Sequence, residues 1–388
     1  MNKPASLTKE TVLDALRTVQ DPELHKDLVT LDMIRNVAVC DGLVRVHVEL
    51  TTPACPLKDR MRSDVEAAVR RLDGVKQVEV EFSAQVRRGV MQQASLPGVK
   101  NILAIGAGKG GVGKSTVSVL TAIGLARAGA KVGLMDADVY GPSIPKMLGI
   151  ENEKPAIVGE QIAPVTAHGL KIMSIGFMLA PEQAVIWRGP MIHGTIKQFL
   201  DQVDWGELDY LIVDLPPGTG DVPLTLSQSI PMTGAVVVCT PQDVALLDAA
   251  KAIAMFRQVN IPVLGMIENM SGFICPDCQK RYDIFGSGGV AKEAREAGVP
   301  FLGEVPINMQ IRVHGDEGKT TANFQDATVA PYLEKICVQL ARNLAEFPSL
   351  LGSGDTERYW KCKELKRALK RVAIKNITIS ITVYCAVR

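Results

Sequence analysis

The feature that most constrains this chain is a glycine-rich loop between an apolar run and a helical pattern. Residues 101–107 form an apolar strand pattern, which leads straight into the loop Gly108-Lys109-Gly110-Gly111-Val112-Gly113-Lys114-Ser115-Thr116. The loop fits G-x-x-x-x-G-K-[ST], the phosphate-binding motif, in the strand–loop–helix context that the motif requires. Its glycines let backbone N–H groups point at phosphate oxygens, and the following helix adds the positive end of its dipole. The sequence therefore predicts a nucleotide-binding α/β domain.

The polar residues around this loop have distinct expected roles. We expect Lys114 to neutralise the β- and γ-phosphates, Ser115 to ligate Mg²⁺, and Thr116 to lie close to the α-phosphate. Asp138 and Asp214 each follow an apolar run. Because the carboxyl ends of parallel strands meet at one edge of a sheet, both acids should lie near the loop. Asp214 ends its run as a Walker B acid does, so we expect it to bind Mg²⁺ through water.

Short apolar runs extend the α/β prediction from residue 101 onward. Their members are continuous rather than alternating, which is typical of parallel strands covered on both faces. The prediction is a doubly wound, mostly parallel sheet of the P-loop NTPase kind. The runs are 102–106, 131–135, 208–213, 235–239, 262–267 and 301–305.

A smaller α+β unit is predicted before this domain. Apolar residues within 8–20 and 61–72 recur at helical spacing, with Thr8 as a possible N-cap, whereas residues 43–50 and 78–82 alternate as half-buried strands do. The predicted organisation is a small domain 1–86, a linker 87–100, an ATPase domain 101–350, and a basic tail 351–388 without an assigned role.

Composition narrows the functional classes. A chain of 388 residues that is 47% hydrophobic can bury a full core. None of its apolar runs reaches the roughly 18 residues of a membrane span. The polar N-terminus lacks the apolar core of a signal peptide, so we expect a cytoplasmic protein without membrane contact. The net charge is +1, and the basic excess lies in residues 351–388, so the acidic remainder offers no nucleic-acid surface.

Among the eight cysteines, Cys275 and Cys278 form the one pair with ligand-like spacing. Two thiolates this close can bind one metal ion or one edge of a cluster, but they do not fill a four-ligand site. Either other cysteines of the chain complete the site, or a second subunit supplies an identical pair across a two-fold axis. The isolated positions of the other six cysteines favour the second reading. Half a zinc site, a redox dithiol and buried thiols remain alternatives.

The second lysine of the loop, Lys109, makes the sequence resemble the MinD/ParA class with its deviant Walker A motif. The resemblance implies an ATP-dependent homodimer in which Lys109 reaches the nucleotide of the partner subunit. By the same resemblance Asp138 matches the position that orients or activates the attacking water. Asn269, in Glu268-Asn269-Met270, matches an Asn that hydrogen-bonds the adenine ring.

Further motifs resemble a narrower group, the Mrp/ApbC (Nbp-like) iron–sulfur cluster carriers. They are the segment DVYGPSIP that begins at Asp138 and the segment ENMSGFICPDC that ends at Cys278, and the match extends over roughly residues 101–345. The resemblance implies that Cys275 and Cys278 hold a [4Fe–4S] cluster between two subunits. It also implies delivery of that cluster to apo iron–sulfur proteins, with ATP hydrolysis gating the transfer.

The N-terminal unit resembles the SufT-like domain that is fused to many Mrp proteins. The matching residues are Asp21-Pro22-Glu23 and the segment TTPACP, which contains Cys55. The resemblance makes Cys55 a candidate for cluster handling, with a partly buried thiol at a helix start as the alternative.

Two other functions are compatible with parts of the pattern. A ParA/MinD-like partitioning or positioning ATPase has no use for the thiolate pair, and it would want a membrane-binding helix or a basic DNA-binding surface. A zinc-stabilised P-loop ATPase fits if a dimer supplies four sulfurs. We therefore predict a cluster carrier that binds neither nucleic acid nor membrane.

Overall fold

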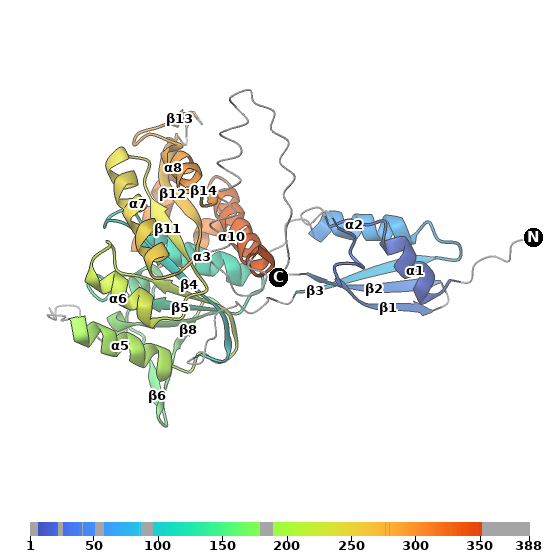
Figure 1. The fold of residues 1–388 in the computed structure, drawn as a ribbon, viewed down its shortest axis with the longest axis horizontal. Coiled ribbons are helices and arrows are strands. Elements are labelled where there is room, and N and C mark those ends of the chain that lie inside the picture. Colours follow the sequence, from blue (N-terminus) through green and yellow to red (C-terminus); the bar gives the residue numbers. More distant parts are fainter. Residues whose placement is uncertain are drawn as a thin grey trace, which may run out of the picture. The chain divides into compact units, whose positions relative to one another are not determined.

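A computed structural model of the chain describes residues 7–21, 26–40, 42–50, 58–84, 86, 96–178, 189–275, 277–278 and 280–350. The predictions that concern Cys55 and the tail 351–388 lie outside these residues. We describe an N-terminal domain, residues 7–86, and a P-loop domain, residues 96–350, each by itself (Figure 1).

The N-terminal domain packs two helices against a three-stranded sheet. Strand β2 (Leu43–Leu50) is antiparallel to β1 (Ile34–Cys40) and parallel to β3 (Gln77–Ala84). Helices α1 (Lys9–Leu16) and α2 (Lys58–Val69) contact each other. The Thr8 hydroxyl accepts a hydrogen bond from the Thr11 N–H at 3.3 Å, so the predicted N-cap is confirmed. The core contains Val12, Leu16, Val44, Val46, Val48, Met61 and Val65.

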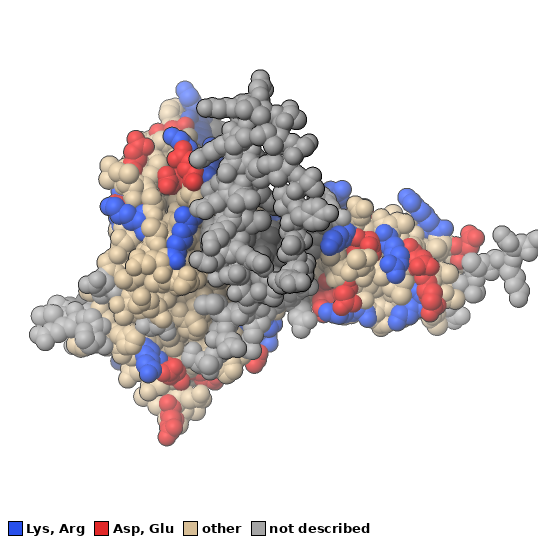
Figure 2. All heavy atoms as spheres, viewed as in Figure 1, with Lys and Arg blue, Asp and Glu red and all other residues tan. Residues whose placement is uncertain are grey.

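The surface of this domain carries charges of both signs, interspersed on the face shown in Figure 2. Several of them are paired across neighbouring strands. Arg35 lies 2.6 Å from Glu49, and Arg45 lies 2.8 Å from Glu79. Such exposed pairs contribute roughly 0–1 kcal/mol each, so the stability of this domain rests mainly on its apolar core.

The P-loop domain is built on a nine-stranded sheet. Its strand order is β13-β12-β11-β4-β10-β5-β9-β8, and β14 pairs with β12. The strands between the two antiparallel edge strands, β8 and β13, are parallel. The bounds are β4 Val99–Gly106, β5 Val132–Asp136, β8 Val165–Ala167, β9 Leu170–Ser174, β10 Leu208–Asp214, β11 Gly234–Cys239, β12 Val263–Ile274, β13 Arg281–Tyr282 and β14 Phe301–Ile307.

Two sets of helices cover this sheet. In one set α5, α6, α7 and α8 contact one another in succession, and in the other α3 contacts α4 and the 3-10 helix η2, which contacts α9. This arrangement is the doubly wound fold that the apolar runs predict (Figure 1). The bounds are α3 Lys114–Arg127, α4 Ile144–Met147, η1 Ile175–Phe177, α5 Gly189–Asp201, α6 Asp221–Ser229, α7 Asp243–Gln258, α8 Gly289–Ala297, α9 Met309–Asp316, η2 Thr320–Phe324 and α10 Ala330–Leu350.

Some elements differ from the sequence-based expectation. Strand β4 begins at Val99, inside the predicted linker, because Val99 already pairs with Leu208 of β10. The short strands β6 (Ala156–Val158), β7 (Gln161–Ala163) and β8 were not predicted, since three residues carry no measurable period. Strand β12 continues well past the apolar run 262–267. Within the described residues, no helix is long and apolar enough to cross a membrane.

Candidate nucleotide site and cysteine hairpin

The glycine-rich loop joins β4 to α3, and its glycines are required by geometry. Gly111 and Gly113 have φ angles of +80° and +82°, which residues other than glycine rarely adopt. A Cβ on Gly113 would lie 2.1 Å from the Asn269 side-chain nitrogen, and a Cβ on Gly108 would lie 2.0 Å from the Asp248 carbonyl oxygen. The loop is therefore packed between the end of β12 and helix α7.

Lys114 lies at the centre of a buried group of polar side chains. Its Nζ is 2.7 Å from Asp214 Oδ2 and 3.4 Å from Asp138 Oδ2, and the lysine is 6% exposed. The Ser115 hydroxyl donates to the same Asp214 oxygen at 2.6 Å. The structure thus brings together the lysine, the hydroxyl and both acids that the sequence singles out.

Asp214 is held from its other side by a residue that the sequence analysis missed. Ser118, one turn into α3, donates a hydrogen bond to Asp214 Oδ1 at 2.6 Å, and neither residue is exposed to solvent. Each carboxylate oxygen of Asp214 therefore has its own donor. The signal was a Ser four residues after the motif lysine, which would face the same side of a helix as Lys114.

Two acids near Asp214, Asp136 and Asp138, have pKa values above the ordinary value of an aspartate. Burial, with a further contribution from the Asp214 charge, raises the pKa of Asp136 to about 8. Asp136 accepts hydrogen bonds from the Ser174 hydroxyl and the Asp138 N–H, at 2.9 and 3.2 Å. Burial also raises the pKa of Asp138, although Lys114 opposes the shift. Asp138 Oδ1 is buried without a hydrogen-bond partner among the described residues, which is uncommon for a polar atom and typical of a functional site.

Lys114, Ser115 and Asp138 line a cavity of about 660 Å³. Lys109, Thr116 and Asn269 also line it, as do residues of the β14–α9 segment. The Asn269 amide donates to the Val112 carbonyl at 2.8 Å, so Asn269 ties the end of β12 to the loop. Lys109 is half-buried and makes no hydrogen bond or ion pair within the described part of the chain.

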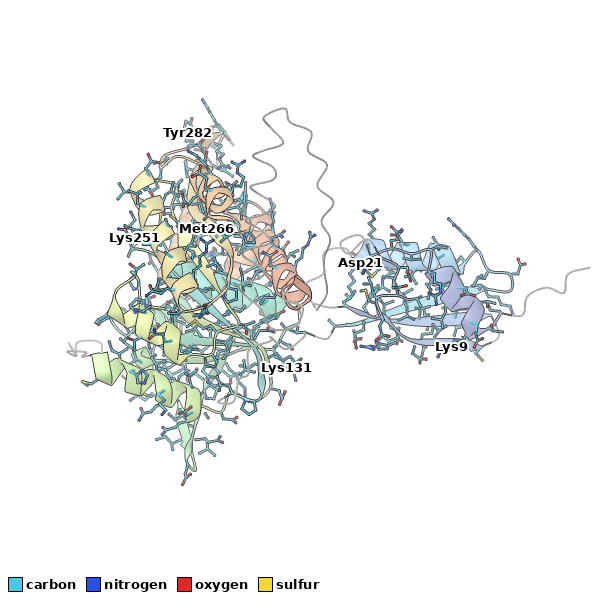
Figure 3. The ribbon with its side chains drawn as sticks, viewed as in Figure 1. Lys9, Asp21, Lys131, Lys251, Met266 and Tyr282 are labelled. Atoms are coloured by element: carbon cyan, nitrogen blue, oxygen red, sulfur yellow. The ribbon has the colours of Figure 1, made fainter. Side chains whose placement is uncertain are left out.

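Cys275 and Cys278 lie in a hairpin between β12 and β13. The strands pair at Phe273 with Tyr282 and at Ile274 with Arg281, and the Cys275 N–H donates to the Lys280 carbonyl at 3.0 Å. Figure 3 shows Tyr282 at the periphery of the domain and Met266, on the same β12–β13 hairpin, in its interior. The thiol loop is thus an outward extension of a core strand.

The two thiols are accessible and chemically distinct from the buried ones. Cys275 is half-buried and Cys278 exposed. Hydrogen bonds from the backbone N–H groups of Cys278 and Asp277 lower the pKa of the Cys275 thiol. Burial instead raises the pKa of Cys239 and of Cys337 to about 12. Within the described residues no third Cys, His, Asp or Glu joins the pair in a metal-sized group.

Comparison with known families decides the assignment. Residues 98–341 match the family described as NUBPL iron-transfer P-loop NTPase, and residues 9–82 match the family described as iron-sulfur cluster assembly protein. The chain belongs to the NUBPL iron-transfer P-loop NTPase family. The resemblance drawn from the loop and the cysteine segment, with a SufT-like domain in front, is confirmed.

Individual relatives of this P-loop NTPase agree with the family match. A Synechocystis sp. protein named iron-sulfur cluster carrier protein is 52% identical over 343 residues, which are 86% of this chain and 97% of the relative. A protein of the same name from Deinococcus radiodurans is 49% identical and covers 88% of this chain and 99% of its own. The solved structure of a nucleotide-binding protein from Archaeoglobus fulgidus in complex with ADP is 44% identical, with a TM-score of 0.53, over 57% of this chain and 88% of that chain.

Proposed function

We propose that this P-loop NTPase carries an iron–sulfur cluster between proteins and that ATP controls its release. The observation that carries the proposal is that one strand, β12, contributes Asn269 to the nucleotide cavity and ends at the accessible thiol of Cys275. The names of the Synechocystis and Deinococcus relatives support the same role. A cluster site and a nucleotide site on one strand are suited to influence each other.

The cargo in this proposal is a [4Fe–4S] cluster held by Cys275 and Cys278 of two subunits. Iron–sulfur clusters are bound by thiolates, and four are needed for a cubane. A lowered pKa increases the thiolate fraction of Cys275 at neutral pH, which favours iron binding. Exposure of Cys278 lets the cluster be passed to an apo iron–sulfur protein by ligand exchange.

The second subunit is proposed to be a copy of this chain facing the cavity. Two apolar side chains near the start of α7, Val244 and Leu247, are each 67% exposed, and Ile284 is 59% exposed. Phe285, next to Ile284, lines the nucleotide cavity, and Gly108 packs against α7. Exposed apolar groups around a ligand site mark an interaction surface. Lys109, without an ion-pair partner in the described residues, is then free to bind the partner's phosphates.

The nucleotide in this proposal is ATP with Mg²⁺. Ser115 and Asp214 supply the oxygen ligands that Mg²⁺ prefers, and Asp138 lines the same cavity. Bound Mg²⁺ would neutralise charge on the phosphates. Phosphates compete with Asp138 and Asp214 for Lys114, so nucleotide binding exchanges the ion pairs of this lysine. Asp138, once released from Lys114, is placed to orient the attacking water, and Asn269 to contact adenine.

Anaerobic reconstitution with iron and sulfide tests the cargo. We expect about four irons per dimer in the wild type, a number set by one [4Fe–4S] cluster, and loss of iron in the Cys275→Ala/Cys278→Ala variant. Cys40→Ala, an exposed thiol of the N-terminal domain, is the matched control and should keep its iron. Cluster transfer to an apo [4Fe–4S] protein is then followed with and without MgATP.

The outcome separates the alternatives. Bound zinc in place of iron would support a zinc-stabilised ATPase. A protein that binds neither iron nor zinc but still hydrolyses ATP would support a positioning ATPase of the ParA/MinD kind. Iron that survives removal of both cysteines would contradict the proposed cluster site.

A further inference from the structure

Strand β12 bends between the nucleotide cavity and the thiol hairpin. Its pairing with β14 shifts register between Asn269 and Phe273. Within this interval Met270 and Gly272 have φ angles of +59° and +71°, outside the range of regular strands. A bulge of this kind redirects the strand, and here it sets the direction in which the hairpin leaves the sheet.

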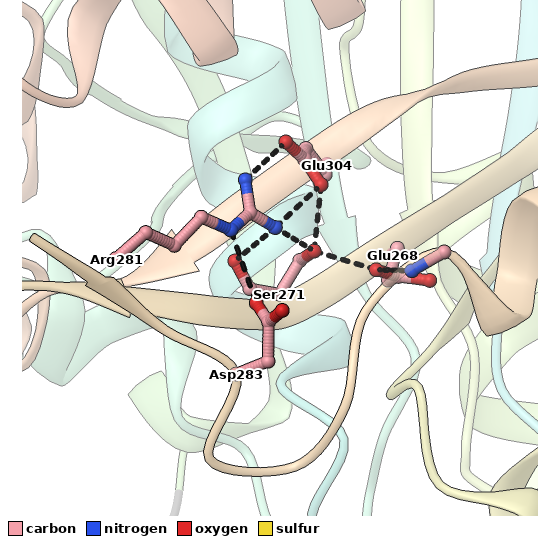
Figure 4. A network of polar contacts seen from close by, with 6 residues as sticks. Glu268, Ser271, Arg281, Asp283 and Glu304 are labelled. Carbon is pink, nitrogen blue, oxygen red and sulfur yellow. Dashed lines mark hydrogen bonds and ion pairs between the residues drawn. The ribbon is translucent and has the colours of Figure 1, made fainter.

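Arg281 holds this bend from the opposite strand of the hairpin (Figure 4). Its guanidinium donates to Glu304 on β14 at 2.9 Å and to Asp283 at 3.1 Å. It also lies 3.1 Å from the Ser271 hydroxyl and 3.3 Å from the Ser271 carbonyl oxygen. A Cβ at Gly272 would lie 2.7 Å from Arg281 Nε, so the guanidinium approaches the backbone of the bulge closely, and the φ of +71° at this position favours glycine. Arg281 thus connects β13, β12 and β14 in the middle of the bulge.

Ser271 continues these contacts toward the nucleotide cavity. Its hydroxyl lies 2.5 Å from Glu268 Oε1 and 2.6 Å from Glu304 Oε2. A hydroxyl has one proton, so it donates to one of these carboxylates at a time. Glu268 is fully buried and accepts the N–H groups of Gly288 and Val290 at the start of α8, each at 2.9 Å. The same carboxylate therefore fixes the segment that follows Phe285.

This set of contacts connects the nucleotide cavity with the thiol hairpin. Phe285 and Asn269 line the cavity, and Asn269 is bonded to the phosphate loop through Val112. The set runs without interruption from the loop, through Asn269, Glu268 and Ser271, to Arg281, which pairs in register with Ile274 next to Cys275. A movement of Asn269 at the cavity reaches the thiols along β12 through the bulge, and a movement of Phe285 reaches the hairpin along the segment that follows Arg281.

We propose that Arg281 is a positioning residue that locks the β12 bulge and thereby couples nucleotide binding to the spacing and exposure of the Cys275 and Cys278 thiols. The inference rests on the proposed function, because it describes how nucleotide would act on the cluster ligands. When Arg281 is replaced, the hairpin stays attached through β12, but its position no longer depends on whether nucleotide occupies the cavity.

Thiol reactivity tests the coupling without any cluster. The rate of Cys275 alkylation in the full-length apoprotein is measured by peptide mass spectrometry, with and without saturating Mg²⁺ and ADP or a non-hydrolysable ATP analogue. We expect nucleotide to change the wild-type rate about fivefold or more, the lower end of coupling factors between two sites. In Arg281→Gln the ratio should fall to about one while nucleotide affinity is retained.

Two variants and one internal standard make the result specific. Arg281→Lys keeps the charge opposite Glu304 and should restore part of the nucleotide effect. Arg45→Gln removes an exposed arginine of the N-terminal domain that also makes two hydrogen bonds to one carboxylate, and it should leave the ratio unchanged. Cys40 alkylation should not respond to nucleotide.

A wild-type rate of Cys275 alkylation that is the same with and without nucleotide would overturn the coupling. A nucleotide effect that persists in Arg281→Gln would overturn the role of Arg281. The proposed carrier function is judged separately, by iron content. A chain that held no iron would still give a thiol-reactivity ratio, so the two failures are distinguishable.

Discussion

Replacement of Ser118 by Ala removes a hydrogen-bond donor from a buried carboxylate. The same hydroxyl also lies 3.0 Å from the Lys114 carbonyl oxygen, but it has one proton, and its contact with Asp214 is the shorter of the two. The Ser118 hydroxyl donates to Asp214 Oδ1 at 2.6 Å, and both residues are fully buried. Lys114 and Ser115 hold the other oxygen, Oδ2, and cannot replace the lost donor. Hydrogen bonds to charged groups contribute about 1.5–3 kcal/mol, so we expect Ser118→Ala to lower the free energy of unfolding by about 2 kcal/mol. That corresponds to about a 30-fold change in the unfolding equilibrium.

The chain offers a matched control for this change. Ser227, on α6, is also buried, and its hydroxyl has no hydrogen-bond partner among the described residues. Ser227→Ala deletes the same atom but no hydrogen bond, and we expect a change within about 0.5 kcal/mol. The difference between the two variants isolates the contact with Asp214 from the loss of a hydroxyl as such.

Urea unfolding followed by tryptophan fluorescence measures both variants. Trp205 is buried in the P-loop domain, and residues 1–86 contain no tryptophan. A background with Trp187→Phe and Trp360→Phe leaves Trp205 as the reporter of this domain. If Ser118→Ala and Ser227→Ala shift the midpoint equally, Asp214 does not depend on Ser118 and the reasoning is wrong. MgATP affinity, measured alongside, should fall for Ser118→Ala alone, because Asp214 is then less well oriented.

Three further outcomes are expected. Gly113→Ala should weaken binding of a fluorescent ATP analogue by tenfold or more, because φ is +82° at this residue and the added Cβ would lie 2.1 Å from the Asn269 side chain. Unchanged affinity would contradict the loop geometry. Lys109→Ala should change the free energy of unfolding, monitored by Trp205, by less than about 0.5 kcal/mol while ATP hydrolysis falls, because Lys109 has no ion-pair partner in the described residues. A large loss of stability would argue against an intermolecular role. Alkylation of Cys275 should proceed at lower pH than that of an ordinary thiol, because its lowered pKa leaves more thiolate as the pH falls. Cys239, with a pKa raised to about 12, should resist the reagent, and mass spectrometry of the peptides across pH 6–9 compares the two rates.

Local chemistry determined much of this protein. The glycine loop needs neighbouring residues only, because a backbone that cradles phosphate requires closely spaced glycines before the Lys-Ser pair. The motif therefore predicted the order strand, loop and helix, and in the structure β4 ends at Gly106 and α3 begins at Lys114. Continuous apolar runs predicted β4, β5, β10, β11, β12 and β14, since strands buried on both faces have no polar alternation. The Thr8 cap and the ligand-like spacing of Cys275 and Cys278 could be predicted because each depends on neighbouring residues only.

The tertiary structure decided which groups meet. Ser118 belongs to no sequence motif, and Asp214 is about a hundred residues further along the chain; the pairing of β10 with β4 brings the Asp214 carboxylate to Ser118 and Lys114. Arg281 and Glu304 become partners because β12 bulges between the strands that carry them, and the conformation of a bulge depends on its neighbours. Sequence patterns report the preferences of short segments, whereas burial, charge pairing and pKa depend on contacts between distant segments.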